Sequence, residues 1–171
     1  MKLAKLRMRN FRCYRDETVI TFEEITALIG KNDSGKSSVM DALDIFLNNG
    51  KPDGDDASKD GVANDLTIIC EFDDLPDEVI IDDKCPTNLE DEYLLNDDGR
   101  LEIHKSYSGN LKTPKCTSIE AIAMHPTRDG ASDLLQLKNS QLKERATELG
   151  VSLEEIDKKI NAEIRSKIWQ S

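Results

Sequence analysis

The chain has 171 residues, of which 37% are hydrophobic, and it carries a formal net charge of −11. At this length one domain with one core is expected, and the negative charge argues against a generally basic, nucleic-acid-binding surface. The sequence also has no apolar run of the roughly 18 residues that a membrane span needs, no signal-peptide core and no C-x-x-C pair, so we expect a cytoplasmic protein with reduced thiols, no zinc knuckle and no membrane partner.

Two strands are predicted near the N-terminus, at residues 3–9 and 17–22, with a turn between them. Alternation along the first strand places Lys5 and Arg7 on the face opposite Leu6. A row of cations is typical of a solvated strand face that protects a sheet edge, and contact with a DNA backbone is the alternative. The first fifteen residues contain six cations and no acid: Lys2, Lys5, Arg7, Arg9, Arg12 and Arg15.

A short apolar run at residues 25–29 predicts a third strand, and apolar residues at helical spacing predict a helix over residues 36–48. Between them, Gly30 to Ser37 reads G-x-x-x-x-G-K-S, the loop that wraps the phosphates of ATP or GTP. Strand, loop and helix is the order that this motif requires. The sequence therefore predicts a nucleotide-phosphate site, and a glycine-rich turn without a ligand is the alternative.

Each residue type in this loop has a chemical role. Gly30 and Gly35 let the backbone approach an anion with no Cβ in the way, and the helix N-terminus adds free N–H groups and partial positive charge. Lys36, the candidate catalytic residue, can reach the β- and γ-phosphates, and the Ser37 hydroxyl can bind Mg²⁺. Since the sequence contains no N-K-x-D guanine motif, ATP is preferred over GTP. The candidate nucleotide-binding residues of the loop are Gly30, Lys31, Asn32, Asp33, Ser34, Gly35, Lys36, Ser37 and Ser38.

Beyond an acidic loop that begins at residue 51, further strands and then helices are predicted. Ser152 and Glu155 have the spacing of a capping box at the start of the last helix. The predicted elements are strands at residues 66–72, 100–107 and 116–124, a helical segment from residue 131 to a stop at Gly150, and a helix from residue 152 to about 168.

Two apolar stretches that end in acids, residues 68–74 and 79–83, mimic the strand that holds Mg²⁺ and polarises water in nucleotide hydrolases. The first has apolar residues on both sides of Glu71, and the second is very short. Sheet residues followed by solvated turns are the favoured interpretation of both. If Asp73 or Asp82 were the metal-site carboxylate, the chain would be a small stand-alone kinase, but the arginines that a kinase lid needs are scattered.

Three features accompany the phosphate loop: the N-F-R segment that ends in Arg12, the Asn32 of the loop, and the Asp-Ala-Leu of residues 41–43. Together they resemble the RecF/SMC-like branch of the ABC ATPases, and within it the OLD (overcoming lysogenization defect) family. The resemblance covers residues 1–47 well and residues 60–140 loosely, and a Pro-x-Arg-Asp stretch at residues 126–129 is a weaker match.

The resemblance implies an α/β fold, a P-loop NTPase core of ABC (RecF/SMC) type with an added antiparallel strand layer and C-terminal helices. The chain would be the N-terminal portion of an ABC-type ATPase head. Its expected parts are the strands, phosphate loop and first helix at residues 1–50, an acidic loop at 51–63, a mainly β part at 64–130 and a helical part at 131–171. The implied ligands are ATP and Mg²⁺, and the implied partner is a second head in a homodimer or a C-terminal half.

By matching position, the resemblance assigns Arg12 to the nucleotide phosphates or adenine and Asn32 to the γ-phosphate or attacking water. Gln136 or Gln141 lies where a glutamine would contact Mg²⁺. The alternatives are that Arg12 is a surface cation, that Asn32 is an ordinary turn residue, and that both glutamines lie on a helix surface. The implied function is that of an ATP-binding head in DNA processing, repair or phage defence, which controls a nuclease or partner elsewhere and meets DNA through other regions. Because no L-S-G-G-like signature is present, little ATP hydrolysis is expected from this chain alone, and a non-catalytic, nucleotide-gated interaction module is the alternative.

Overall fold

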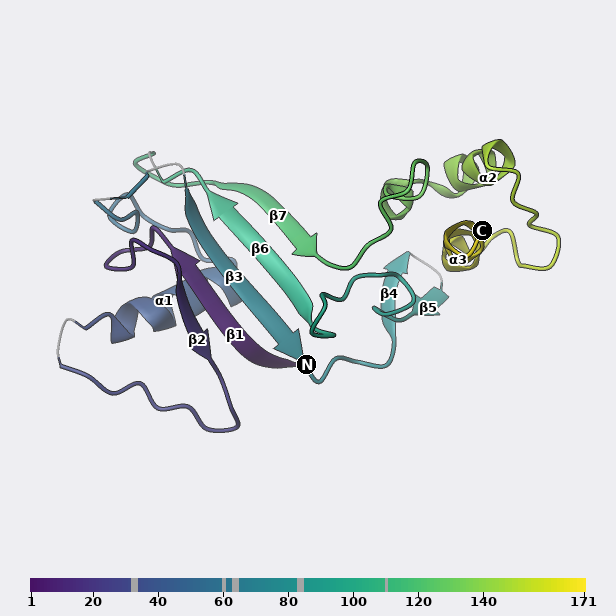
Figure 1. The fold of residues 1–171 in the computed structure, drawn as a ribbon. Helices are drawn as coiled ribbons and strands as arrows, with labels where there is room; N and C mark the ends of the chain where they lie inside the picture. Colours follow the sequence, from purple (N-terminus) through teal and green to yellow (C-terminus); the bar gives the residue numbers. More distant parts are fainter. Residues whose placement is uncertain (32–33, 60, 63–64, 83–84, 110) are drawn as a thin grey trace. The chain divides into compact units, whose positions relative to one another are not determined.

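The computed structural model describes residues 1–31, 34–59, 61–62, 65–82, 85–109 and 111–171. These residues form two units, each assembled from two stretches of chain (Figure 1). Unit 1 consists of Met1–Leu75 and Arg100–Ile122, and unit 2 of Pro76–Gly99 and Ala123–Ser171. Each unit contains its own cluster of buried apolar side chains.

Unit 1 is built on a five-stranded antiparallel sheet with the strand order β2-β1-β3-β6-β7 (Figure 1). The central strand β3 pairs with β1 on one side and β6 on the other, and all but its last residue are buried. All five strands confirm strands that the sequence predicts. Their bounds are β1 Lys2–Arg9, β2 Thr18–Thr21, β3 Leu66–Asp73, β6 Leu101–Tyr107 and β7 Cys116–Ile122.

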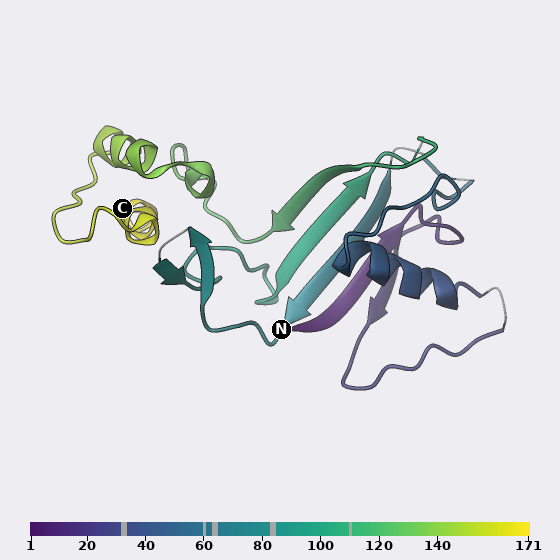
Figure 2. The same cartoon turned by 180° about the vertical axis from the view of Figure 1, so that it is seen from behind.

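One helix, α1 (Lys36–Leu47), covers one face of this sheet (Figures 1 and 2). Its Val39 and Phe46 belong to the same buried cluster as Leu6 and Ile68 of the strands. The predicted helix at residues 36–48 is thus confirmed, and so is the alternation that turns Leu6 away from the cations of β1. Burial of this apolar face, rather than helix propensity, holds α1 in place.

The opposite face of the sheet carries a network of ion pairs. Glu71 of β3 is only 3% exposed and has Lys5 Nζ at 3.2 Å and a guanidinium nitrogen of Arg7 at 3.4 Å. Glu102 of β6 accepts a hydrogen bond from Arg7 and lies 2.6 Å from His104 Nε2. Lys5 and Arg7 of the first strand are therefore paired with acids of the neighbouring strands, so this face is ion-paired rather than simply solvated.

The third predicted strand, at residues 25–29, is not formed. The chain runs there without regular structure, and Ile25 and Ile29 are 91% and 93% exposed. A strand requires a neighbour that pairs with its backbone, and none of the described strands lies beside this segment. The apolar pattern of residues 25–29 is that of a strand, but no strand among the described residues pairs with it, so the segment stays irregular.

Unit 2 combines a two-stranded hairpin with short helices around a small core. The hairpin consists of β4 (Val79–Asp82) and β5 (Cys85–Thr87), so the first four residues of the 79–83 stretch form a strand and Asp83 lies outside the described residues. The core contains Leu134, Leu142, Ala146, Ile164 and Ile168. The helical elements are η1 (Leu134–Gln136), α2 (Asn139–Glu148) and α3 (Asn161–Trp169).

The helices of unit 2 are shorter than the sequence predicts. Leu137 has extended backbone angles, which separate η1 from α2, and the Gln141 side chain accepts a hydrogen bond from the N–H of Lys138 at 3.0 Å. The predicted stop at Gly150 is confirmed, because Gly150 adopts φ 69° directly after the end of α2.

The capping box at Ser152 and Glu155 is wrong as a helix start. No hydrogen bond between these two residues occurs in the described part of the chain, and α3 begins only after Ile160. The carboxylate of Glu163 instead accepts the N–H of Asp157 at 2.9 Å. The capping-box pattern therefore does not set where α3 begins.

Candidate functional site

The phosphate loop ends in a glycine that no other residue can replace without strain. Gly35 precedes the first residue of α1 and adopts φ 87°, a left-handed conformation that favours glycine. A Cβ built on Gly35 would lie 2.6 Å from the Tyr14 hydroxyl and 2.8 Å from Cys13 Sγ. The glycine is therefore required both for the turn into the helix and for the close approach of the β1–β2 turn.

The side chain of Lys36 folds back over the loop. Its ammonium group donates hydrogen bonds to the carbonyl oxygens of Gly30 at 2.7 Å and Lys31 at 2.5 Å, and it lies 3.3 Å from Ser34 Oγ. Carbonyl and phosphate oxygens are both acceptors of charge-assisted hydrogen bonds from an ammonium group. Asn32 and Asp33, which also belong to the predicted site, lie outside the described residues.

The start of α1 presents donors and one free hydroxyl. The first turn contains no acidic residue, so the unpaired N–H groups and the positive end of the helix face no competing carboxylate of that turn. Ser37 is exposed, whereas Ser38 is 6% exposed and belongs to the buried side of the helix. Of the two serines, only Ser37 is placed to meet a metal ion from solvent.

Arg12 lies in the turn that contacts the phosphate loop, but its guanidinium is held by carboxylates. Nε donates to Asp56 at 2.6 Å, and a terminal nitrogen donates to Asp41, which lies in α1. Burial opposes the positive charge, but the hydrogen bonds and charges of Asp56 and Asp41 outweigh it and raise the pKa of Arg12 above its ordinary value. The structure therefore places Arg12 beside the first turns of α1 and pairs it with acids.

Tyr14 is a site residue that the sequence analysis did not single out. Its hydroxyl donates to the carbonyl oxygen of Gly35 at 3.2 Å, and burial raises the pKa of the phenol. The contact ties the β1–β2 turn to the start of α1. The sequence alone does not reveal this contact between Tyr14 and Gly35, because it depends on two segments that are close in space but separate in the chain.

The two acids considered as metal-site carboxylates, Asp73 and Asp82, have different surroundings. Asp82 of unit 2 accepts a hydrogen bond from Arg165 at 2.6 Å, whereas the buried Oδ1 of Asp73, the last residue of β3, has no hydrogen-bond partner among the described residues. Glu71 of the same strand is surrounded by cations on the far face of the sheet from α1. No group of three His, Cys, Asp or Glu side chains suited to a metal ion occurs among the described residues. Within the described part of the chain, Ser37 is the candidate metal ligand that remains beside the phosphate loop.

The two glutamines considered as Mg²⁺ contacts both lie in unit 2. Gln136 is exposed in η1, and Gln141 caps the start of α2. Each fits the alternative of an ordinary helical glutamine. Arg128 of the Pro-x-Arg-Asp stretch donates to the carbonyl oxygen of Ile168 at 2.7 Å, so it stabilises the end of α3.

The sequence also leads to predictions about the cysteines and about membrane-spanning segments. All four cysteines are free in this structure. Among the residues described, none of the helices has the length and apolar character needed to cross a membrane.

Comparisons with known proteins identify the kind of domain. The family described as AAA ATPase domain matches the chain over residues 1–171. A 47-residue stretch, 27% of this chain, is 43% identical to structural maintenance of chromosomes protein 1 of Arabidopsis thaliana. The protein of the same name in Schizosaccharomyces pombe matches with the same identity and coverage. A 44-residue stretch, 25% of the chain, is 43% identical to chromosome partition protein Smc of Halobacteriovorax marinus. These matches span only 4% of the length of each relative.

Proposed function

The chain belongs to the AAA ATPase domain family, and from that membership we propose that unit 1 binds ATP with Mg²⁺ at the phosphate loop, as the nucleotide-binding part of an SMC/RecF-like ATPase. The observation that carries the proposal is the position of Lys36, whose ammonium is enclosed by carbonyl oxygens of the loop at 2.5 and 2.7 Å. Phosphate oxygens of ATP would exchange with these acceptors. The loop and the start of α1 supply the remaining donors.

In this proposal each residue of the site has a distinct role. Lys36 contacts the β- and γ-phosphates, and Ser37 binds Mg²⁺. Arg12 reaches the nucleotide by exchanging the carboxylate of Asp41 for a phosphate oxygen. A phosphate group is the stronger partner because it carries more negative charge than a carboxylate. The other residues of the loop cradle the phosphates through their backbone or side chains: Gly30, Lys31, Asn32, Asp33, Ser34, Gly35 and Ser38.

The test is calorimetric titration of ATP with Mg²⁺ into the wild type and three variants. Lys36→Ala is expected to weaken binding about a hundredfold, because it removes a charge-assisted contact to phosphate, and Ser37→Ala to remove the part of the affinity that depends on Mg²⁺. Lys59→Ala, which removes an exposed lysine of unit 1, serves as the matched control and should bind as the wild type does. Equal ATP affinity in Lys36→Ala and Lys59→Ala would sink the assignment.

The finer role is proposed from the resemblance. We place the chain in an OLD-like ATPase of DNA processing, repair or phage defence, in which ATP governs assembly with a second head and controls a nuclease or partner elsewhere. The relatives named as chromosome-maintenance and chromosome-partition proteins support a role near DNA. The ion-paired cations of β1 do not, since Lys5 and Arg7 already face Glu71, so any contact with DNA is assigned to other regions.

Turnover by this chain alone is expected to be slow. Phosphoryl transfer requires groups arranged around the attacking water and the γ-phosphate, and the sequence contains no L-S-G-G-like signature that would complete this arrangement. A phosphate-release assay is the measurement. Fast turnover that Asp82→Asn or Asp73→Asn abolishes would favour a complete small P-loop enzyme, whereas ATP binding without turnover fits the alternative of a nucleotide-gated interaction module.

A further inference from the structure

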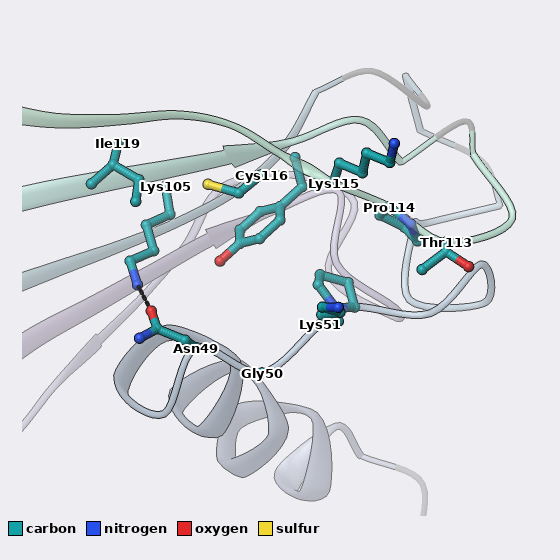
Figure 3. Close-up of a pocket in the computed structure, with 11 residues that line it drawn as sticks. Asn49, Gly50, Lys51, Lys105, Thr113, Pro114, Lys115, Cys116 and Ile119 are labelled. Atoms are coloured by element: carbon teal, nitrogen blue, oxygen red, sulfur yellow. Dashed lines mark hydrogen bonds between the residues drawn. The ribbon is translucent and has the colours of Figure 1, made fainter.

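Unit 1 contains a cavity of about 400 Å³ beyond the far end of α1 (Figure 3). It lies between the segment that follows α1 and the segment that leads into β7, with Lys105 and Tyr107 of β6 in its wall. Since α1 starts at the phosphate loop and has 12 residues, its axis separates the two places by about 18 Å. The cavity is therefore not part of the proposed ATP site.

Tyr107 is the unusual group in the wall of this cavity. Its side chain belongs to the buried core and is only 3% exposed, yet its hydroxyl forms no hydrogen bond with any described residue. Burial, with smaller contributions from Cys116 and Cys70, raises the pKa of Tyr107 to about 12. The phenol is thus protonated at neutral pH. Its hydroxyl can therefore donate a hydrogen bond to an acceptor that enters the cavity.

Three lysines line the same cavity. Lys51 lies on the segment that follows α1 and Lys115 on the segment that leads into β7 (Figure 3). Both are exposed, and neither forms an ion pair with a described residue. Lys105 donates to the carbonyl oxygen of Phe46 at 2.8 Å and lies 3.2 Å from Asn49 Oδ1. It neutralises the negative end of α1, which would otherwise repel an anion.

The remaining wall is apolar and lacks acids. Pro52 and Pro114 are buried, and Ile119 of β7 adds an aliphatic surface. None of the described residues that line the cavity is a carboxylate, although the chain has a net charge of −11. The volume is in the range of small-molecule sites, about 300–1,000 Å³. The wall thus combines cations and a phenol hydroxyl with an apolar surface.

We propose that this cavity is a second ligand site, which binds a phosphate monoester of a small molecule with an apolar body. A phosphate monoester carries a charge of about −1.5 to −2 and three acceptor oxygens, which suits a wall that contains lysines, a phenol and no carboxylate. A carboxylate has one charge and would leave most of these donors unmatched. Lysine also binds phosphate as a point charge without the paired geometry that favours arginine for carboxylates.

The probe for this site is phenyl phosphate, followed by calorimetry and ligand-observed NMR. Wild-type protein is expected to bind it at least about tenfold more tightly than phenol, benzoate or inorganic phosphate, because only the monoester satisfies both the cations and the apolar wall. The double variant K51Q/K115Q should lose about tenfold or more in affinity. Tyr107→Phe, which keeps the ring and its packing, should lose severalfold.

Two controls separate this site from the ATP site and from general charge effects. Lys36→Ala should bind phenyl phosphate as the wild type does. The double variant K2Q/K59Q removes the same charge from exposed lysines of unit 1 that do not line the cavity, and it too should bind normally. Absence of binding to the wild type, loss of binding in Lys36→Ala, equal loss in both double variants, or equal affinity for phenol or benzoate would each overturn the proposal. Circular dichroism checks folding, and Tyr107→Phe keeps the test decisive if the lysine variants misfold.

Discussion

Gly35, at the start of α1, meets two separate structural requirements. Gly35 needs a positive φ of 87°, and it also needs the space where the Tyr14 hydroxyl and Cys13 Sγ approach it. The first demand is conformational and belongs to the residue alone. The second arises because the β1–β2 turn packs against the loop, so the two contributions can be measured separately.

Gly35→Ala is expected to lower the free energy of unfolding by about 2–4 kcal/mol, from the left-handed conformation and the steric clash together. Gly99→Ala is the matched control, because Gly99 has φ 71° but no described atom lies within 4 Å of its added Cβ. It should lose only the conformational part, about 1–2 kcal/mol. Urea denaturation of both variants measures the difference, and equal losses would show that the contact with Tyr14 adds nothing.

Tyr107 predicts a pH dependence of stability at alkaline pH. Its pKa rises from 10.0 to about 12 on folding, so below pH 10 both the folded and the unfolded state hold the proton and no effect is expected. Above pH 10 the unfolded state ionises first, and the free energy of unfolding falls until the pH passes about 12, by up to about 3 kcal/mol. Tyr107→Phe should lack this part of the decline. Denaturation of both proteins between pH 9 and pH 12 is the measurement, and parallel curves would contradict the prediction.

At the scale of the elements, the ionic face of the sheet depends on one acid of the central strand. Glu71→Gln is expected to lower the free energy of unfolding by about 2–4 kcal/mol, because it leaves the charges of Lys5, Arg7 and Arg100 without their shared partner. Glu120→Gln removes an exposed acid of β7 and should change stability by less than about 0.5 kcal/mol. Thermal or urea unfolding at low salt compares the two. A loss of similar size in both variants would mean that net charge, not the buried cluster, sets the effect.

The elements show which features the sequence could predict. Strands β1 and β3 and helix α1 follow from alternation or helical spacing, and the glycine-rich loop marks the start of α1 correctly. Residues 25–29 have an equally good strand pattern, but a strand also needs a paired neighbour, and the pattern of one segment cannot supply it. The partners of Arg12 were not predictable either, because Asp41 and Asp56 lie 29 and 44 residues away in the chain.

At the scale of the whole molecule, the chain has two cores and a single tryptophan that reports on one of them. Trp169 lies in α3 of unit 2 and packs against the cluster that contains Ile164. The same unit contains Arg165, fully buried, whose guanidinium donates two hydrogen bonds to Glu92 at 2.6 and 2.7 Å. Leu6, by contrast, belongs to the core of unit 1.

Ile164→Ala is expected to lower the stability that Trp169 fluorescence reports by about 2–5 kcal/mol, because it opens a cavity in the core of unit 2. Leu6→Ala opens a cavity of similar kind in unit 1 and should leave the fluorescence transition in place while lowering the stability that far-ultraviolet circular dichroism reports for the sheet. Both side chains are 0% exposed, so the pair is matched for burial. A fluorescence transition that moves equally in both variants would show that the units unfold together.

The pairing of β3 with β6 has a consequence for the engineering of this chain. Phe72 near the end of β3 is the partner of Leu101 at the start of β6, so the two strands meet as the arms of a hairpin would. Residues 76–99 leave and return at that point, where a short turn would suffice. They therefore have the character of an insertion at a hairpin tip, a position where added sequence disturbs a sheet least. A shortened gene that joins the two arms and stops after Ile122 would encode every strand pairing of the five-stranded sheet.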